Sequence, residues 1–122
     1  MLRLAASILE AVNYYVIIIF APLLVLTGIL GHILPEKKSL ASGAPAYNVF
    51  HIIFGLIGIM VATNHFDYIR IFNISFGLID LYQAAASYLH LFPKKYFKWK
   101  STDDVLHVVI GAFLVLIGVF AN

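Results

Sequence analysis

Asp104-Val105-Leu106-His107, with Gly111 four residues beyond the histidine, decides the predicted fold, because a similar stretch occurs earlier in the chain. The earlier copy is Asn48-Val49-Phe50-His51, with Gly55 at the same spacing. In both copies a short polar side chain precedes a histidine by three residues. A glycine then follows the histidine by about one helical turn. The pattern predicts an internal repeat.

A second pair of stretches supports the repeat. His32 and His90 each begin the form His-x-x-Pro, and each precedes its downstream copy by a similar distance. We therefore interpret the chain as two diverged copies of one helical hairpin, each carrying two histidines near its bend.

The composition is that of a membrane protein. Of the 122 residues, 62% are hydrophobic and 11% are charged, and the mean hydropathy is +0.96, whereas soluble domains average about 25% charged residues. The length accommodates about four spans of roughly 20 residues each, with short loops. The absence of cysteine excludes disulfides, thiolate metal sites and thiol catalysis.

The apolar runs predict where the spans lie. We expect helices at about 12–34, 46–62, 69–92 and 101–121, with the two repeats at about 12–62 and 69–121. The N-terminal apolar run continues to Leu34, so we interpret it as a retained span and not as a cleaved signal. The predicted fold is all-α: one transmembrane domain over 1–122, a four-helix bundle formed by a duplicated two-helix hairpin.

The third predicted span carries a polar stripe. Its members step by three and four residues, as one face of a helix does. Such a face is costly in lipid, so it must face inward or toward a partner. The stripe comprises Asn73, Gly77, Asp80, Ala84 and Ser87, flanked by Gln83 and His90.

Asp80 lies near the middle of that span, where a carboxylate costs at least about 2.5 to 3.5 kcal/mol. We expect it to be protonated and hydrogen bonded to Gln83, Asn73 or Thr27. The alternative is a proton or ion relay through Asp80, Ser87 and His90.

The basic residues predict the orientation. Six of the eight Lys and Arg residues lie in the two loops at 35–45 and 93–102. By the positive-inside rule these loops face the cytoplasm or stroma, and both termini lie on the periplasmic or lumenal side of a bacterial inner membrane or thylakoid. The lysines and aromatic residues of 93–102 are typical of the lipid headgroup layer. They favour anionic headgroups or an acidic partner over nucleic acid.

The two copies resemble the pattern of a bacterial family of small four-helix membrane proteins of unknown function. Members of that family carry one Asn-x-x-His-type motif at the start of the second span and another at the start of the fourth. The matching positions are Asn48, His51 and Gly55, and then Asp104, His107 and Gly111. The resemblance covers most of the chain; it implies the four-helix fold and no established activity.

The histidines are candidate axial ligands of a haem iron or a chlorophyll magnesium: His51, His107, His32 and His90. In that interpretation the glycine one turn beyond each motif histidine makes room for the macrocycle. The alternative is that each histidine hydrogen-bonds a loop carbonyl or the motif Asn or Asp, while each glycine lets two helix backbones touch. A zinc site of four histidines is less favoured, because zinc sites commonly include cysteine or carboxylate ligands.

The sequence predicts a class of function. No nucleotide-binding loop, serine-nucleophile elbow or glycosidase-type carboxylate pair is present. Our first hypothesis is a non-enzymatic accessory or scaffold subunit of a larger membrane complex, in contact with lipid and with a membrane-protein partner or a second copy. The second is a haem- or chlorophyll-binding subunit of an electron-transfer or light-harvesting complex. The third is a small proton-coupled carrier that uses Asp80.

Overall fold

The computed structural model describes residues 2–35 and 41–121. Within these ranges the chain is helical and contains no strand, which confirms the all-α prediction. The elements, in chain order, are α1 Leu2–Ile33, α2 Pro45–Asn64, the short 3-10 helix η2 Phe66–Tyr68, α3 Ile69–Leu89, α4 Lys94–Phe97 and α5 Ser101–Phe120.

Three helices are long and apolar enough to cross a bilayer. They are residues 12–33 of α1, all of α2 and all of α5. The helix α3 has 21 residues but is not one of the three, because its polar residues lower its hydropathy. The described residues therefore support a membrane protein with three candidate spans, and the fourth span stays a prediction.

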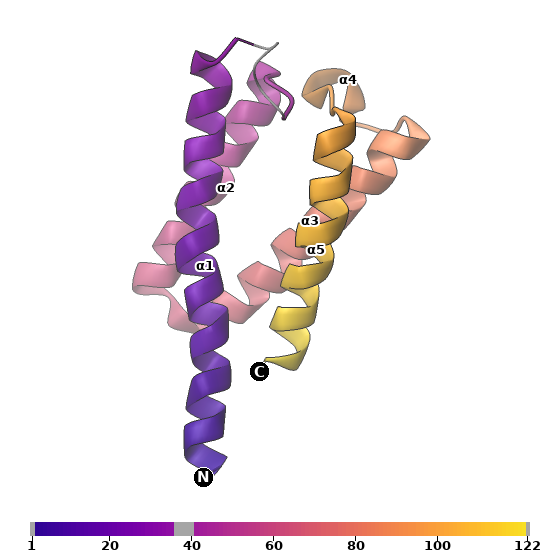
Figure 1. The fold of residues 1–122 in the computed structure, drawn as a ribbon. Helices are drawn as coiled ribbons and strands as arrows, with labels where there is room; N and C mark the ends of the chain where they lie inside the picture. Colours follow the sequence, from indigo (N-terminus) through magenta and orange to yellow (C-terminus); the bar gives the residue numbers. More distant parts are fainter. Residues whose placement is uncertain (1, 36–40, 122) are drawn as a thin grey trace.

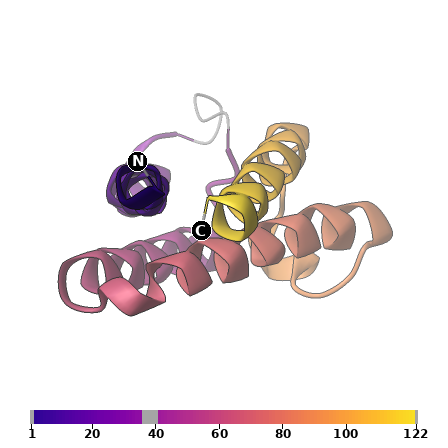
Figure 2. The same cartoon turned by 90° about the horizontal axis from the view of Figure 1, so that it is seen from below.

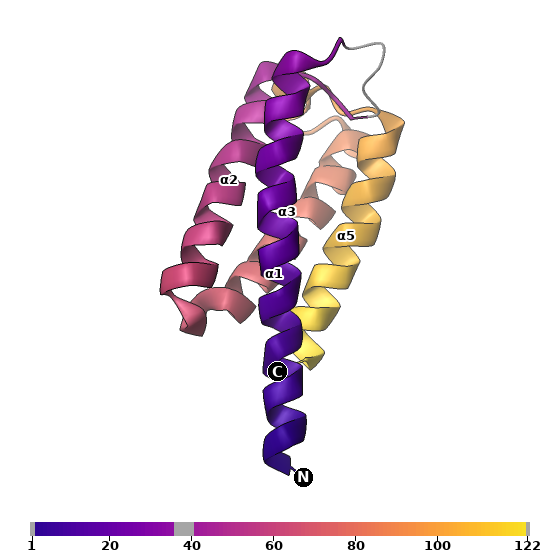
Figure 3. The same ribbon diagram turned by 60° about the vertical axis from the view of Figure 1, so that its left-hand side comes forward.

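The helices associate in two pairs. The helix α1 runs beside α2, and α3 runs beside α5 (Figures 1 and 3). Viewed from below, α1 and α5 lie over the same side of α2 and α3 (Figure 2). Both chain ends lie at one end of the bundle, and α4 lies at the other (Figure 1).

An aromatic core joins the two pairs. Phe76 of α3 is buried, and its ring lies 5.5 Å from the ring of Phe20 of α1 and 5.4 Å from the ring of Phe54 of α2, measured between centroids. Each such pair contributes about 0.5 to 1.5 kcal/mol beyond its buried area. The core also includes Ile17, Ala21, Leu24, Ala62, Ile69, Phe72 and Leu114.

Polar contacts fasten the end of the bundle where the termini lie. The Arg70 side chain of α3 donates from Nε to the Gly118 carbonyl oxygen at 2.6 Å and from Nη2 to the Val119 carbonyl oxygen at 3.2 Å. These are carbonyls of the last turn of α5, which lack partners within the helix. Arg70 thereby links the start of α3 to the end of α5.

Candidate functional site

A cavity of about 250 Å³ lies among α1, α2, α3 and α5. Its walls on α1 are largely apolar, and its polar groups come mainly from the other three helices. It brings together three of the sequence-predicted residues, His51, Asp80 and His107, with Tyr47 and Asp103, which the motif comparison did not select. The full lining is Phe20, Leu23, Leu24, Thr27, Ala41, Tyr47, His51, Asp80, Asp103, Leu106, His107 and Ile110.

Tyr47 lies between the two motif histidines. Its hydroxyl oxygen is 2.8 Å from Nε2 of His107, and its ring centroid is 4.1 Å from that of His51. The hydroxyl donates its proton to Oδ1 of Asp103 at 3.0 Å, so it accepts one from Nε2 of His107. This arrangement assigns the neutral tautomer of His107 that is protonated at Nε2, which leaves Nδ1 as an acceptor.

Asp103 is the centre of the hydrogen bonding at this end of the bundle. Its Oδ2 accepts from the backbone N–H of Ser42 at 2.9 Å and from that of Lys100 at 2.8 Å, in addition to the Tyr47 bond at Oδ1. Asp103 is 1% exposed, and each hydrogen bond to a charged group contributes about 1.5 to 3 kcal/mol. Asp103 therefore holds the segment before α2, the segment before α5 and Tyr47 in fixed positions.

Asp104, the residue that the repeat selected, has a different environment from its counterpart Asn48. The Asn48 side chain is buried, donates to the Gly43 carbonyl oxygen at 3.0 Å and lies 3.4 Å from Nδ1 of His32. Asp104 is half-buried, and its Oδ1 has no hydrogen-bond partner within the described ranges. The sequence signal for Asp103 was its place in the first turn of α5, where an acidic side chain can accept from the backbone N–H before the helix.

Neighbouring helices occupy the space beside each motif glycine. A methyl group at Gly55 would lie 2.7 Å from the Ala21 carbonyl oxygen of α1, and one at Gly111 would lie 2.8 Å from the Gly77 carbonyl oxygen of α3. The space beside each glycine is therefore occupied by a helix backbone. This contradicts the expectation that these glycines make room for a macrocycle, and it agrees with the alternative in which they let helices touch.

The polar stripe of α3 lies inside the bundle. Asp80, Gln83, Asn73 and Ser87 are each at most 3% exposed. Gln83 donates from Nε2 to Oδ1 of Asp80 at 3.3 Å and accepts from Nε1 of Trp99 at 3.1 Å. Gln83 is thus one of the partners expected for Asp80.

The other expected partners of Asp80 bond elsewhere. Asn73 donates to the backbone oxygen of Asn13 at 3.2 Å and to its side-chain oxygen at 3.0 Å, and Thr27 donates to the Leu23 carbonyl oxygen at 2.7 Å. Asn13 in turn donates to two carbonyl oxygens at the end of α5, so these amides tie α1 to α3 and α5.

The relay proposed through Ser87 and His90 has no continuous connection. His90 is exposed and ends α3 in the left-handed conformation, with φ at 59°. No hydrogen bond links the Ser87 side chain to Asp80 or to His90 within residues 2–35 and 41–121. The Ser87 backbone oxygen instead accepts from Nζ of Lys94 at 2.5 Å.

The four candidate axial ligands do not converge. His51 and His107 are 6% and 5% exposed and line the cavity, whereas His32 and His90 are exposed. The cavity is smaller than the roughly 300 to 1,000 Å³ of pockets for drug-sized ligands, and Nε2 of His107 is engaged by Tyr47. Together with the filled glycine spaces, these observations do not fit a tetrapyrrole held between the two motif histidines. No group of three or more His, Asp or Glu side chains in the described part of the chain could hold a metal ion.

Comparison with known proteins gave no match among protein-family models, curated proteins or solved structures.

Proposed function

We propose that the chain is a small integral membrane protein of four spans, formed by a duplicated two-helix hairpin of the kind found in the bacterial family that its motifs resemble. The glycine contacts support the duplication. The Ala21–Gly55 approach recurs as the Gly77–Gly111 approach, with each residue displaced by 56 positions.

A second contact follows the same displacement. A methyl group at Gly58 would lie 2.8 Å from Cβ of Ala21, and one at Gly77 would lie 3.0 Å from Cβ of Leu114. Ala21 and Gly58 correspond to Gly77 and Leu114 at the offset of 56. Agreement of both contacts at a single offset supports descent of the two pairs from one hairpin, related by an axis along the membrane normal.

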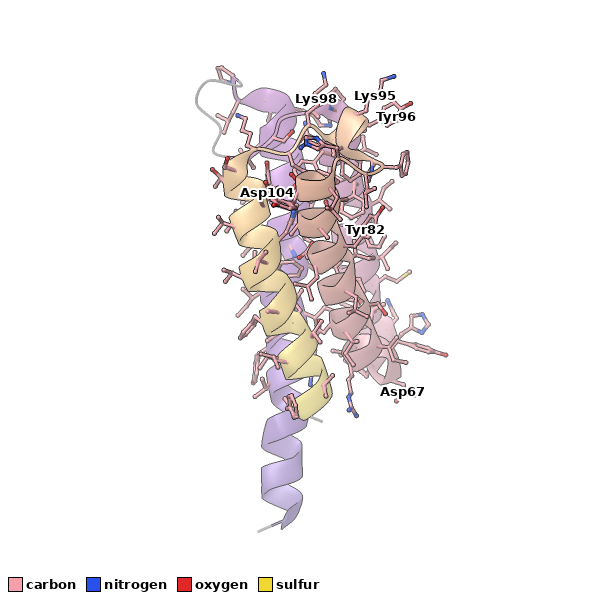
Figure 4. The ribbon with its side chains drawn as sticks, turned by 90° about the vertical axis from the view of Figure 1, so that its right-hand side faces the viewer. Asp67, Tyr82, Lys95, Tyr96, Lys98 and Asp104 are labelled. Carbon is pink, nitrogen blue, oxygen red and sulfur yellow. The ribbon has the colours of Figure 1, made fainter. Side chains whose placement is uncertain are left out.

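In the proposed topology the lysine-bearing end faces the cytoplasm or stroma, and both termini face the periplasm or lumen. Lys95, Tyr96 and Lys98 lie at one end of the bundle and Asp67 at the other (Figure 4). The chain has no native cysteine, so Lys95→Cys and Asp67→Cys can be labelled from outside with a membrane-impermeant maleimide. Only Asp67→Cys is expected to react in intact cells, and the reverse pattern would contradict the topology.

The function that we propose is that of an accessory subunit of a larger membrane complex, without catalysis of its own. The observation that carries this proposal is the length of α1. It has 32 residues, roughly 48 Å at about 1.5 Å per residue, whereas the hydrocarbon layer is about 30 Å thick. Its N-terminal part projects beyond the other helices (Figures 1 and 3).

The projecting segment, residues 2–11, is LRLAASILEA and is largely apolar. A short helix without tertiary contacts has little stability in water. A partner protein in the periplasmic or lumenal interface would stabilise this segment by packing against it. The polar groups inside the bundle support the absence of catalysis, since Asp103 and Asn13 bond mainly to backbone groups and so hold helices and loops together.

Native electrophoresis in a mild detergent tests this function. The parent chain is expected to migrate in a larger complex, and changing Ile8 and Leu9 to serine is expected to release it. The matched control changes Leu91 and Phe92, two exposed apolar residues at the other end of the bundle, to serine. Migration of the parent chain alone, or equal release by both double variants, would reject the proposal.

A proton-coupled carrier is the second candidate, because Asp80 is 3% exposed, lines the cavity and has one hydrogen bond, from Gln83. A carrier of this kind would lose proton flux in proteoliposomes when Asp80 is changed to Asn. Flux that is the same in both proteins would exclude this candidate.

A further inference from the structure

The cavity has a mouth on the lipid side of the bundle. Three residues of its lining, Leu23 and Thr27 of α1 and Leu106 of α5, are exposed, so the cavity opens sideways between these two helices. All three lie in the apolar stretches that can cross a bilayer. The mouth therefore faces acyl chains, and a molecule that enters must be lipid-soluble.

The inner end of the cavity offers hydrogen bonds that the protein leaves unused. Neither ring nitrogen of His51 has a partner within the described residues, although the side chain is 6% exposed. Nδ1 of His107 also has none. Asp80 uses one carboxyl oxygen, for the bond from Gln83. A neutral imidazole has one donor and one acceptor, so the cavity lining presents both kinds of group.

Charge and size select the class of ligand. Asp80 and Asp103 line the cavity, and none of the described lining residues is Lys or Arg, so an anionic head would find no cationic partner in this low-dielectric setting. A hydroxyl head both donates and accepts, which suits His51 and Asp80 together. The volume of about 250 Å³ accommodates such a head with a short length of chain, and the rest of an apolar tail would leave through the mouth into the bilayer.

We propose that the cavity between α1 and α5 binds a neutral, lipid-soluble alcohol, with its hydroxyl group between His51 and Asp80 and its apolar tail extending past Leu23 and Leu106 into the membrane.

Trp99 supplies the readout for this site. It is the only tryptophan of the chain, and it donates to Gln83, which donates to Asp80. A hydroxyl bound at Asp80 would alter this chain of hydrogen bonds and hence the emission of Trp99. Because the purified chain is used, the result does not depend on the partner proposed above.

The experiment titrates the full chain, in phosphatidylcholine nanodiscs, with 1-decanol, decane and decanoate. Decanol is expected to shift the Trp99 emission saturably, whereas decane and decanoate give only the linear response of partitioning. His51→Phe is expected to weaken decanol binding about tenfold, the effect of losing one net hydrogen bond. His65→Phe changes an exposed histidine at the opposite end and is expected to leave binding unchanged.

Equal responses to decanol and decane, or the absence of a saturable response, would overturn the proposal and indicate a cavity that holds only water or bulk lipid. Should His51→Phe fail to fold, as judged by circular dichroism and elution volume, Leu106→Trp in a Trp99→Phe background places the fluorophore at the mouth. Saturable quenching of that tryptophan by a brominated decanol, with none by brominated decane, is then expected. Equal quenching by the two would reject the site.

Discussion

The α1–α2 pair and the α3–α5 pair share one close backbone contact and differ in the chemistry around it. Gly55 approaches the backbone at Ala21 as Gly111 approaches the backbone at Gly77. In the first pair, Ile17, Leu24 and Tyr47 occupy positions where, 56 residues later, the second has Asn73, Asp80 and Asp103.

The difference shows that helix approach and polar bonding are separate requirements in this bundle. The approach depends on the absence of a side chain, which a glycine provides in either pair. The polar bonding runs between the pairs: Asn73 bonds to Asn13 of α1, and Asp103 bonds to Tyr47 of α2. At the positions 17/73, 24/80 and 47/103 the two pairs therefore carry different side chains, although their glycine contacts match.

The largest expected effect comes from changing what the pairs share. Gly111→Val would place a branched side chain against the Gly77 carbonyl oxygen, which already lies 2.8 Å from the position of a Cβ. We expect a loss of about 3 kcal/mol in unfolding free energy, because backbone cannot move aside as a flexible side chain can. Gly55→Val should lose a similar amount. The measurement is unfolding by sodium dodecyl sulfate in mixed micelles, followed by Trp99 emission.

Gly43→Ala is the control for these variants, since its Cβ would lie 3.5 Å from the Gly31 carbonyl oxygen, an ordinary contact. Its unfolding free energy should stay within about 0.5 kcal/mol of the parent. A Gly111→Val protein as stable as the control would mean that the backbone contact is not essential to the α3–α5 pair.

The second effect concerns a polar residue found in one pair alone. Asp103→Ala would leave the Ser42 and Lys100 N–H groups and the Tyr47 hydroxyl without their acceptor. We expect a loss of about 2 to 4 kcal/mol, because buried unpaired donors retain their desolvation cost. Asp104→Ala, the adjacent acid, should cost at most about 0.5 kcal/mol. Equal losses in the two variants, in the same unfolding assay, would show that the motif position carries the bonding after all.

The sequence predicted those features that depend on periodicity. The polar stripe of α3 can be read from spacing, because a helix repeats every 3.6 residues, and the helical class and the three most apolar spans can be read from long apolar runs. Contact between helix backbones at the motif glycines was one of the two alternatives that the sequence offered. The first-turn position of Asp103 indicates its local bond from the Lys100 N–H, but its bonds from the Ser42 N–H and the Tyr47 hydroxyl were missed, because no local pattern specifies which distant segment meets α5.

The histidines show the same limit. The repeated His-x-x-x-Gly spacing at His51 and His107, together with the His-x-x-Pro stretches at His32 and His90, suggested four equivalent ligands. Only His51 and His107 lie in the bundle. His90 ends α3 with φ at 59°, and His32 is in the last turn of α1. Both lie in or beside the loops, where exposure depends on the path of the chain and not on helical periodicity.

A moderate effect is expected when Asn73 is changed to isoleucine, the residue type at the corresponding position 17 of the first pair. The change removes the two hydrogen bonds that Asn73 donates to Asn13 and leaves the Asn13 side-chain oxygen unpaired. We expect a loss of about 1 to 2 kcal/mol, in the unfolding assay used for Asp103. Asn13→Ala should lower the unfolding free energy less in the Asn73→Ile protein than in the parent protein, because the two residues share these bonds. If the two single losses of unfolding free energy add up to the loss in the double variant, the hydrogen bonds between Asn73 and Asn13 would be contradicted.

The smallest effect is expected at Asp80, where the first pair has Leu24. Asp80 is 3% exposed and accepts one bond, of 3.3 Å, from Gln83. This single bond offsets only a small part of the free energy that it costs to bury the carboxyl group. Asp80→Leu removes that cost and leaves Nε2 of Gln83 without its acceptor. The two terms oppose each other, so the unfolding free energy should change by less than about 1 kcal/mol.

With the reporter Leu106→Trp in the Trp99→Phe background, the same variant should abolish the saturable quenching by brominated decanol, because the proposed acceptor for the hydroxyl is gone. If stability is unchanged and binding is lost, Asp80 has a role in ligand binding, whereas Asp103 has a role in holding the fold. A loss of stability as large as that of Asp103→Ala would place both acids in one structural network and remove the reason to assign Asp80 to a binding site.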